Sequence, residues 1–263
     1  MADVKMPLTA HLEELRKRLI RSLLAITVGF SVCYAFADPL FRFLARPLVE
    51  LTQSPDPEAA VHLIGTGIAE AFFTKLKVAV FGGIFLATPI VLYQIWQFVV
   101  PGLYDSEKRY ARPFVIFGTI FFVAGAAFCY FAVMPLGYQF FIEQYATIGV
   151  SPEIRISEYL TFTSRMLLAF GVTFEMPVVT FFLARVGLVT HMMMIRQTRY
   201  AIVAIFIVAA IMTPADVASQ LLMAGPLLVL YALSIGVAYV FGTRVEPAPE
   251  EESPDDESPS VPA

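Results

Sequence analysis

The sequence predicts an all-α membrane protein with six transmembrane helices in a curved arrangement. Three observations predict this fold class. Apolar residues make up 58% of the 263 residues and the mean hydropathy is +0.72, which is more apolar than a soluble domain. Six long runs contain no charged residue, apart from a single acid in the fourth. A basic cluster stands directly before the first run, as expected for the cytoplasmic start of a membrane span.

The stretch from His11 to Arg21 opens the first helix. Four leucines share one helical face because they recur at steps of four, three and four: Leu8, Leu12, Leu15 and Leu19. The following run, Ser22–Ala37, has no charge, so the helix is expected to start in the cytoplasm and continue into the bilayer. Glu13 and Glu14 then lie at the cytoplasmic rim. Each has a base four residues later, which favours an ion pair within the helix.

Five further runs supply the remaining spans: Val78–Tyr104, Pro113–Ile142, Met166–Ala184, Tyr200–Ala215 and Val217–Thr243. A straight span needs about 20 residues. The fifth of the six runs has 16 residues, or about 24 Å of helix. Pro226 interrupts the sixth run, so the last two helices are predicted to be short or kinked. Pro89 and Pro177 bend two earlier spans, and bent helices of unequal length predict a concave body.

Six spans place both termini on one side of the membrane. Of the 18 lysines and arginines, we assign twelve to cytoplasmic segments and six to outer ones, which favours a cytoplasmic N-terminus. Residues 1–244 then form a six-span membrane domain. Residues 245–263 are expected to form a disordered cytoplasmic tail, because residues 246–263 hold seven acids, five prolines and no base.

Two long segments between spans, Asp38–Lys77 and Gly137–Arg165, mix apolar and polar residues and are expected to pack as caps on the outer surface. Cys33 and Cys129 lie singly in apolar runs, which favours buried thiols over a disulfide. No metal site or cofactor is expected, since the sequence has no CxxC motif and no His/Cys cluster.

Enzymatic activity and nucleic-acid binding are not expected. The sequence has no nucleophile with a base at plausible spacing and no glycine-rich phosphate loop. It also has no basic patch interleaved with aromatic residues, which argues against a nucleic-acid partner.

Glu175 is the one acid inside a predicted span. An acid at the bilayer centre costs about 2.5–3.5 kcal/mol to insert, so it normally faces a partner or a wet cavity. One reading is a structural hydrogen bond to a neighbouring helix. We favour the other reading, a polar spot on a concave surface that faces a ligand.

Other polar and aromatic groups have two readings each. Four aromatic residues near the inner end of the second span are typical of a membrane-interface belt: Tyr93, Trp96, Phe98 and Tyr104. Glu107 has two interpretations: a solvated charge in a loop, or a carboxylate that binds a guanidinium ligand at the cytoplasmic rim. The last group surrounds the short outer turn between the fifth and sixth spans and consists of Thr213, Asp216, Ser219 and Gln220. These residues can cap helices or hydrogen-bond to the membrane helix of another protein.

Four blocks in the right order carry a family resemblance: His11–Leu19 (HLEELRKRL), Pro89–Phe98 (PIVLYQIWQF) running on to Pro101 and Glu107, Phe170–Pro177 (FGVTFEMP), and Thr213–Asp216 (TPAD) with Ser219 and Gln220. The sequence resembles TatC, the signal-peptide receptor of the twin-arginine protein translocase, over roughly residues 8–242. The resemblance implies six helices in a glove-like shape in the bacterial inner membrane, with both termini cytoplasmic. A twin-arginine signal is an address read by a receptor.

The resemblance also implies roles for single residues. Recognition of the paired arginines falls to Glu14, Arg16, Lys17, Phe98 and Glu107. Glu175 is the acid of the fourth span, and Pro47 and Asp216 are functional residues of the outer loops. Thr213 and Gln220 match the site for a partner helix. The family usually has two prolines before Asp216, and here Ala215 stands in place of the second.

The partners implied by the resemblance are TatA-like and TatB-like single-span proteins, folded cargo with twin-arginine signals, and further copies of the chain. Transport then draws on the proton-motive force without a cofactor. The alternatives from the residues alone are a proton-coupled secondary transporter that uses Glu175 and a membrane scaffold with no transport role. The lack of an internal repeat and the single intramembrane acid disfavour the transporter.

Overall fold

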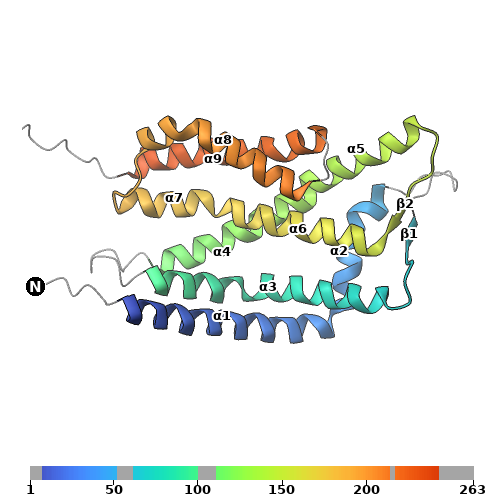
Figure 1. The fold of residues 1–263 in the computed structure, drawn as a ribbon, viewed down its shortest axis with the longest axis horizontal. Helices are drawn as coiled ribbons and strands as arrows, with labels where there is room; N and C mark the ends of the chain where they lie inside the picture. Colours follow the sequence, from blue (N-terminus) through green and yellow to red (C-terminus); the bar gives the residue numbers. More distant parts are fainter. Residues whose placement is uncertain (1–7, 52–61, 100–110, 214–216, 243–263) are drawn as a thin grey trace, which may run out of the picture.

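The computed structural model of the protein describes residues 8–51, 62–99, 111–213 and 217–242 (Figure 1). Six helical stretches are long and apolar enough to cross a membrane: Thr9–Ala35, Glu70–Phe98, Pro113–Tyr145, Ile156–Arg185, His191–Met212 and Gln220–Phe241. The six predicted spans are therefore confirmed. The first helix begins and the last helix ends at the same end of the bundle, here called the terminal end (Figure 1). The opposite end, which carries the two short strands, is called the cap end.

Helices α1 (Leu8–Ala35) and α3 (Glu70–Val99) run antiparallel and side by side (Figure 1). Two glycines allow this approach, because a Cβ added at Gly29 would lie 2.6 Å from the carbonyl oxygen of Gly83. The Cys33 side chain packs on Gly82 in the same contact, since a Cβ there would lie 2.9 Å from the Cys33 Sγ. Close backbone approach through small residues is a usual way for membrane helices to associate.

The third span is continuous but not uniform. Helix α4 (Ala111–Phe128) passes through the π-helix η4 (Cys129–Val133) into α5 (Met134–Thr147). The Met134 N–H donates to the Cys129 carbonyl, which is the five-residue step of a π turn. Cys129 and Cys33 are both buried free thiols, as predicted.

The fourth span is broken at Glu175. Helix α6 (Ile156–Phe174) ends directly before this residue, and α7 (Met176–Arg185) begins directly after it. Pro177 stands in the first turn of α7, where its missing N–H needs no acceptor. The predicted bend is thus a junction between two helices.

Helices α8 (His191–Met212) and α9 (Val217–Phe241) form a hairpin. Thr190 caps α8 by accepting the Met193 N–H at 3.2 Å, so the helix starts well before the predicted apolar run. With 22 residues, or about 33 Å, α8 is long enough to span, and only its apolar stretch is short. Pro226 lies inside α9, as predicted.

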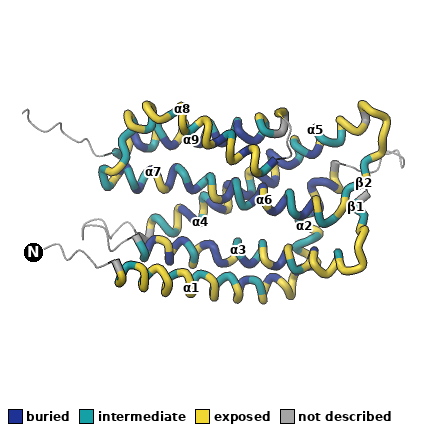
Figure 2. Tube along the Cα trace, viewed as in Figure 1, coloured by how far each residue is buried: buried dark blue, intermediate teal, exposed yellow. Residues whose placement is uncertain are grey.

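Both long connections fold into the cap end. Helix α2 (Ala37–Leu51) follows α1, and strands β1 (His62–Ile64) and β2 (Glu153–Arg155) pair in parallel, with Leu63 opposite Ile154. The sequence predicted caps here but no strands. The phenol hydroxyl groups of Tyr130 and Tyr159 donate to the carbonyls of Phe43 and Leu44 at 2.7 and 2.6 Å. These bonds hold α2 on the buried core, whereas α1 and α8 remain largely exposed, as expected for helices that face lipid (Figure 2).

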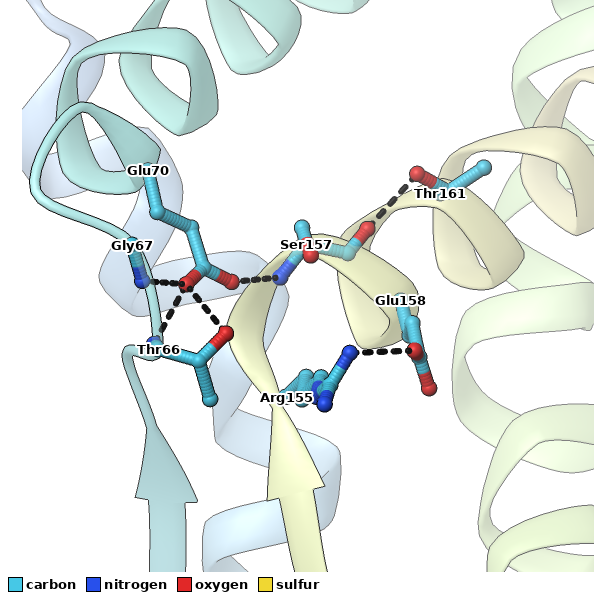
Figure 3. A network of polar contacts seen from close by, with 7 residues as sticks. All are labelled: Thr66, Gly67, Glu70, Arg155, Ser157, Glu158 and Thr161. Carbon is cyan, nitrogen blue, oxygen red and sulfur yellow. Dashed lines mark hydrogen bonds and ion pairs between the residues drawn. The ribbon is translucent and has the colours of Figure 1, made fainter.

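Glu70 joins the two caps (Figure 3). Its Oε2 accepts the backbone N–H groups of Thr66 and Gly67 at 2.6 and 3.1 Å, and its Oε1 accepts the N–H of Ser157 at 3.1 Å. One carboxylate therefore caps the start of α3 and binds the start of α6. This link keeps β1 and β2 in register beside it.

We predict that Gly29→Ala separates α1 from α3 and lowers the thermal stability of the detergent-solubilised protein. Overpacking a tight contact costs about 1–3 kcal/mol. Gly236→Ala on α9 is the matched control, because a Cβ there meets nothing within 4 Å. The control should be neutral or stabilising, since Ala favours helix over Gly. Equal melting temperatures for the two variants would contradict the close contact.

We predict that Glu70→Ala loosens the cap end. The N–H groups of Thr66, Gly67 and Ser157 lose their shared acceptor, so amide hydrogen exchange in β1 and β2 should become severalfold faster by mass spectrometry. Glu143→Ala serves as the control, since that exposed acid accepts only one bond from the neighbouring Gln139 among the described contacts. Unchanged exchange in the Glu70 variant would show that the strands hold the caps without it.

Candidate functional site

A half-buried ion pair lies where α1 and α3 meet at the terminal end. The Arg18 guanidinium donates to Glu14 Oε1 at 3.1 Å, and both side chains are about one-fifth exposed (19% and 21%). The same guanidinium donates to the side-chain oxygens of Gln94 and Gln97 at 3.3 and 3.4 Å. Glu14 is thus fixed against α3 through Arg18, and its second oxygen accepts no hydrogen bond from the described residues.

The register of α1 and α3 places these groups together. Arg18 stands eleven residues before Gly29, and Gln94 stands eleven residues after Gly83. Eleven residues are close to three helical turns, so each residue lies on the same face as its glycine. In an antiparallel pair that crosses at Gly29 and Gly83, Arg18 and Gln94 must therefore face each other.

The other predicted recognition residues surround this pair. Lys17 bonds Glu13 at 2.8 Å in an exposed pair, so both pairs expected from the four-residue spacing are present. Arg16 is exposed. Phe98 stacks on the ring of His11 with centroids 4.4 Å apart, which connects α1 and α3 one turn nearer the terminal end. Glu107 lies outside the described residues.

Glu175 lies at the junction of α6 and α7 and is only 9% exposed. Neither carboxylate oxygen has a hydrogen-bond partner in the described part of the chain. Helix α4 makes room for it with Gly118, since a Cβ there would lie 3.0 Å from Glu175 Oε2. The reading of Glu175 as a structural hydrogen bond to a neighbouring helix finds no such bond among these residues.

An apolar groove of about 600 Å³ opens between α4, α7 and α9, next to Glu175. Its walls include Phe117 of α4, Pro177 and Phe181 of α7, and Phe241 of α9. Phe117 precedes Gly118, and Pro177 follows Glu175 by two residues, so the acid is a near neighbour of the groove in sequence. Its two oxygens are buried at Gly118 and do not line the groove.

Trp96 belongs to the core beside this groove and not to an interface belt. It is 1% exposed and lies against Phe114 and Phe182, with ring centroids at 4.7 and 4.3 Å. The prediction of a belt is therefore wrong for Trp96, because its helix face packs on α4 and α7. Tyr93 is exposed, as a belt residue should be.

The polar groups of the hairpin are engaged within it. The Thr213 hydroxyl donates to the Ala209 carbonyl at 2.9 Å, and Gln220 Nε2 donates to the Phe206 carbonyl at 3.0 Å. Thr213 thus continues the bonding at the end of α8, and Gln220 ties α9 to α8. Asp216 lies outside the described residues. Pro47 is buried in α2 beside Leu48, within the cap end.

Metal chemistry has no visible basis at these positions, since the described residues contain no group of three or more His, Cys, Asp or Glu side chains placed to hold an ion. The arrangement instead offers a fixed carboxylate for a cationic ligand and an apolar groove with one acid. Both features suit binding of a segment that is charged at one end and apolar along its length.

A family model described as the Sec-independent protein translocase protein (TatC) matches residues 10–226. The chain belongs to the TatC family. It is 46% identical over 250 residues to the Sec-independent protein translocase protein TatC of Desulforapulum autotrophicum, across 95% of this chain and 90% of that protein. The TatC protein of Campylobacter jejuni is 43% identical over 249 residues, across 95% of this chain and 98% of that protein.

Two solved structures agree with this membership. A crystal structure of the twin arginine translocase receptor TatC matches with a TM-score of 0.77 at 37% identity, across 87% of this chain and 97% of that one. A second crystal structure of the receptor, in the detergent DDM, matches with a TM-score of 0.78 at 36% identity, across 87% of this chain and 99% of that one. As a TatC protein with six apolar helices, the chain is a multi-pass membrane component of a protein translocase.

Sequence reasoning missed the contacts that Arg18 makes across to α3. The spacing within one helix predicted the Glu14–Arg18 pair. The recognition role beside Glu14, however, was assigned to Arg16 and Lys17 and not to Arg18. The two glutamines three residues apart, Gln94 and Gln97, were the available signal, since polar side chains on one face of a predicted span need partners.

We predict that Arg18→Gln loosens the start of α1. Hydrogen bonds to a charged group contribute about 1.5–3 kcal/mol each, so amide exchange in the first turns of α1 should rise about tenfold or more. Lys17→Gln removes the neighbouring exposed pair and should change exchange little. Hydrogen exchange by mass spectrometry compares the two variants, and similar rates in both would contradict a structural link through Arg18.

Proposed function

We propose that this chain is the receptor and core subunit of a twin-arginine protein export system. It recognises the paired arginines of a signal peptide at the cytoplasmic face and, with TatA-like and TatB-like partners, moves folded proteins across the membrane. The observation that carries this proposal is the Glu14 carboxylate, which is held at the membrane rim with one oxygen unused by the described residues.

Recognition of a guanidinium follows from the geometry at Glu14. Arg18 occupies Oε1 and fixes the carboxylate, so Oε2 is available to an arginine of the ligand. With Oε1 taken by Arg18, the contact is a charge-assisted N–H bond to Oε2, and the rigid planar guanidinium aims this donor better than the flexible ammonium of lysine does. Glu107 is the proposed second carboxylate, for the second arginine. Phe98, stacked on His11, offers an aromatic edge beside them.

Arg16 and Lys17 are proposed to take part by excluding weaker ligands. They make the surface around Glu14 basic, so this surface repels cationic ligands. A ligand with a single cation therefore gains little binding energy there. In a ligand with two guanidiniums, each group binds a carboxylate, and the two contacts together offset the repulsion. This reading keeps both residues in the recognition site without a direct contact to the arginines.

The apolar part of the signal is proposed to lie in the groove between α4, α7 and α9. The groove walls are apolar along their length, and Glu175 stands at one side without a partner among the described residues. The carboxylate is buried behind the groove wall, so a donor of the inserted segment reaches it once the wall side chains move aside. A hydrogen bond to Glu175 within the hydrocarbon would fix the depth and orientation of the inserted segment, because a misplaced segment would leave the acid without a partner.

The partner helices are proposed to bind at the α8–α9 hairpin, with Thr213 and Gln220 as polar contacts and Asp216 and Pro47 acting at the outer surface. Thr213 and Gln220 each use a donor within the hairpin, so the Gln220 side-chain oxygen and the Thr213 hydroxyl oxygen are acceptors left for a partner among the described contacts. We place the terminal end on the cytoplasmic side of a bacterial inner membrane, with several copies of the chain in one complex.

A proton-coupled small-solute transporter is the second candidate, because the unpartnered acid Glu175 is what such a mechanism needs. The groove beside it favours the peptide reading, since walls lined by Phe117, Phe181 and Phe241 suit an apolar segment better than a polar solute. The two candidates differ in what the purified protein binds.

We predict that the purified protein binds a synthetic twin-arginine signal peptide and discriminates against its twin-lysine form. Glu14→Gln should weaken binding about 10- to 100-fold, since a charge-assisted hydrogen bond contributes about 1.5–3 kcal/mol. Photo-crosslinking or fluorescence anisotropy in detergent measures this. Glu13→Gln is the matched control, because Glu13 is the adjacent exposed acid and pairs with Lys17.

Equal affinity for the two peptides would favour the transporter or a passive scaffold. Equal loss in the Glu13 and Glu14 variants would mean that the basic helix attracts the peptide by net charge alone. Loss confined to Glu14→Gln supports recognition of a guanidinium at this carboxylate.

A further inference from the structure

A second polar pocket lies at the cap end, away from Glu14 and from the groove beside Glu175. It has a volume of about 410 Å³ and lies between α3, α6 and the end of α8. Two cations and two hydroxyl groups line one side, and apolar side chains of α8 line the other: Lys77, Arg165, Ser157, Thr161, Ile211 and Met212. Such a combination of charge and apolar surface differs from the all-apolar groove.

The polar side is built from one face of α6. Ser157, Thr161 and Arg165 recur every four residues and so form a stripe along the helix. Lys77 reaches over from α3 and donates to the Thr161 hydroxyl at 3.1 Å. That hydroxyl donates its own hydrogen to the Ser157 carbonyl at 2.6 Å (Figure 3), so its oxygen is left to accept from Lys77. The ammonium group is thereby held beside the stripe.

The pocket carries a net positive charge. Neither Lys77 nor Arg165 forms an ion pair with any residue that the structure describes. The acid on the pocket wall, Glu158, lies 3.7 Å from Arg155 and is shared with that residue (Figure 3). Two cations therefore face the cavity with at most one carboxylate to balance them, and an anion is the ligand that this field attracts.

The level of the pocket along the bundle identifies the source of the anion. Met212 is the last residue of α8, and the neighbouring Ile211 is 71% exposed. Both line the same cavity as the cations, so Lys77 and Arg165 lie at the level where the hairpin leaves the bilayer. Lipid phosphates are found at this level, and long basic side chains near span ends reach toward them.

We propose that this pocket binds the headgroup of an anionic phospholipid in the leaflet at the cap end. The phosphate accepts hydrogen bonds from Lys77 and Arg165, and the Ser157 hydroxyl stands beside it as a further donor. The acyl chains leave the pocket along the exposed apolar face of α8, starting at Ile211. A free phosphate ion would use only the polar side, so the apolar wall is what selects a lipid. The site is separate from the proposed recognition of a signal peptide, but its lining includes Thr213, which the proposed partner-helix site also uses.

The test is native mass spectrometry of the full chain, purified in detergent and titrated with phosphatidylglycerol or phosphatidylcholine. We expect a tight first equivalent of phosphatidylglycerol, and a preference over phosphatidylcholine that falls about fivefold for each cation removed. Arg165→Gln is the main variant, because this exposed residue has no bond among the described contacts that its loss would break. Arg42→Gln is the matched control, since it removes one exposed cap-end charge outside the pocket. Lys77→Gln and Arg165→Lys complete the set.

Each outcome decides the proposal. Loss of preference in Arg165→Gln and Lys77→Gln, with retention in Arg42→Gln and Arg165→Lys, supports it. Equal binding of both lipids by the unmodified protein, or equal loss in Arg42→Gln, overturns it. A large excess of inorganic phosphate should leave the phosphatidylglycerol bound. Complete displacement would show an anion site without lipid selectivity and would also overturn the proposal. Thermal unfolding of each variant confirms that folding is unchanged.

Discussion

The close contact between α1 and α3 is the constraint on which the proposed recognition site depends. Gly29 and Gly83 have no side chains, so the two backbones touch and the relative register of the helices is fixed there. Three turns toward the terminal end, that register brings Arg18 to Gln94. Glu14 is therefore positioned by a contact within the α1–α3 pair far from it in sequence, as well as by its neighbours in sequence. A larger residue at either glycine would move the carboxylate without changing any group in the site.

The acid in the fourth span depends on a second glycine and on a broken helix. Pro177 cannot donate to the helix, and the chain accommodates it by ending α6 and starting α7 around Glu175. Gly118 leaves the space into which the carboxylate points. Such an unpaired acid is costly in hydrocarbon. On the proposal that a segment bound in the adjacent groove supplies the partner, this cost would belong to binding and not to the stability of the fold.

Features that depend on local sequence were predicted correctly, and those that depend on distant partners were not. The six spans follow from runs of apolar residues, and the pairs of Glu13 with Lys17 and Glu14 with Arg18 follow from a spacing of four. The pairing of β1 with β2 joins segments about ninety residues apart, and its three-residue strands carry no pattern of their own. The same holds for Trp96, whose position near a span end suggested an interface, whereas contacts with α4 and α7 bury it.

The two ends of the bundle are built on different principles. At the cap end, polar bonds connect distant segments: Glu70 bonds Ser157, Tyr130 and Tyr159 bond the backbone of α2, and Lys77 bonds Thr161. Since Ser157 and Thr161 also line the cap-end pocket, that pocket is fixed by the same network. At the terminal end, the polar bonds join α1 to α3, and the groove separates α4 from α7 and α9. A segment that enters from the terminal end therefore meets an apolar groove between helices, whereas at the cap end polar bonds join the segments to one another.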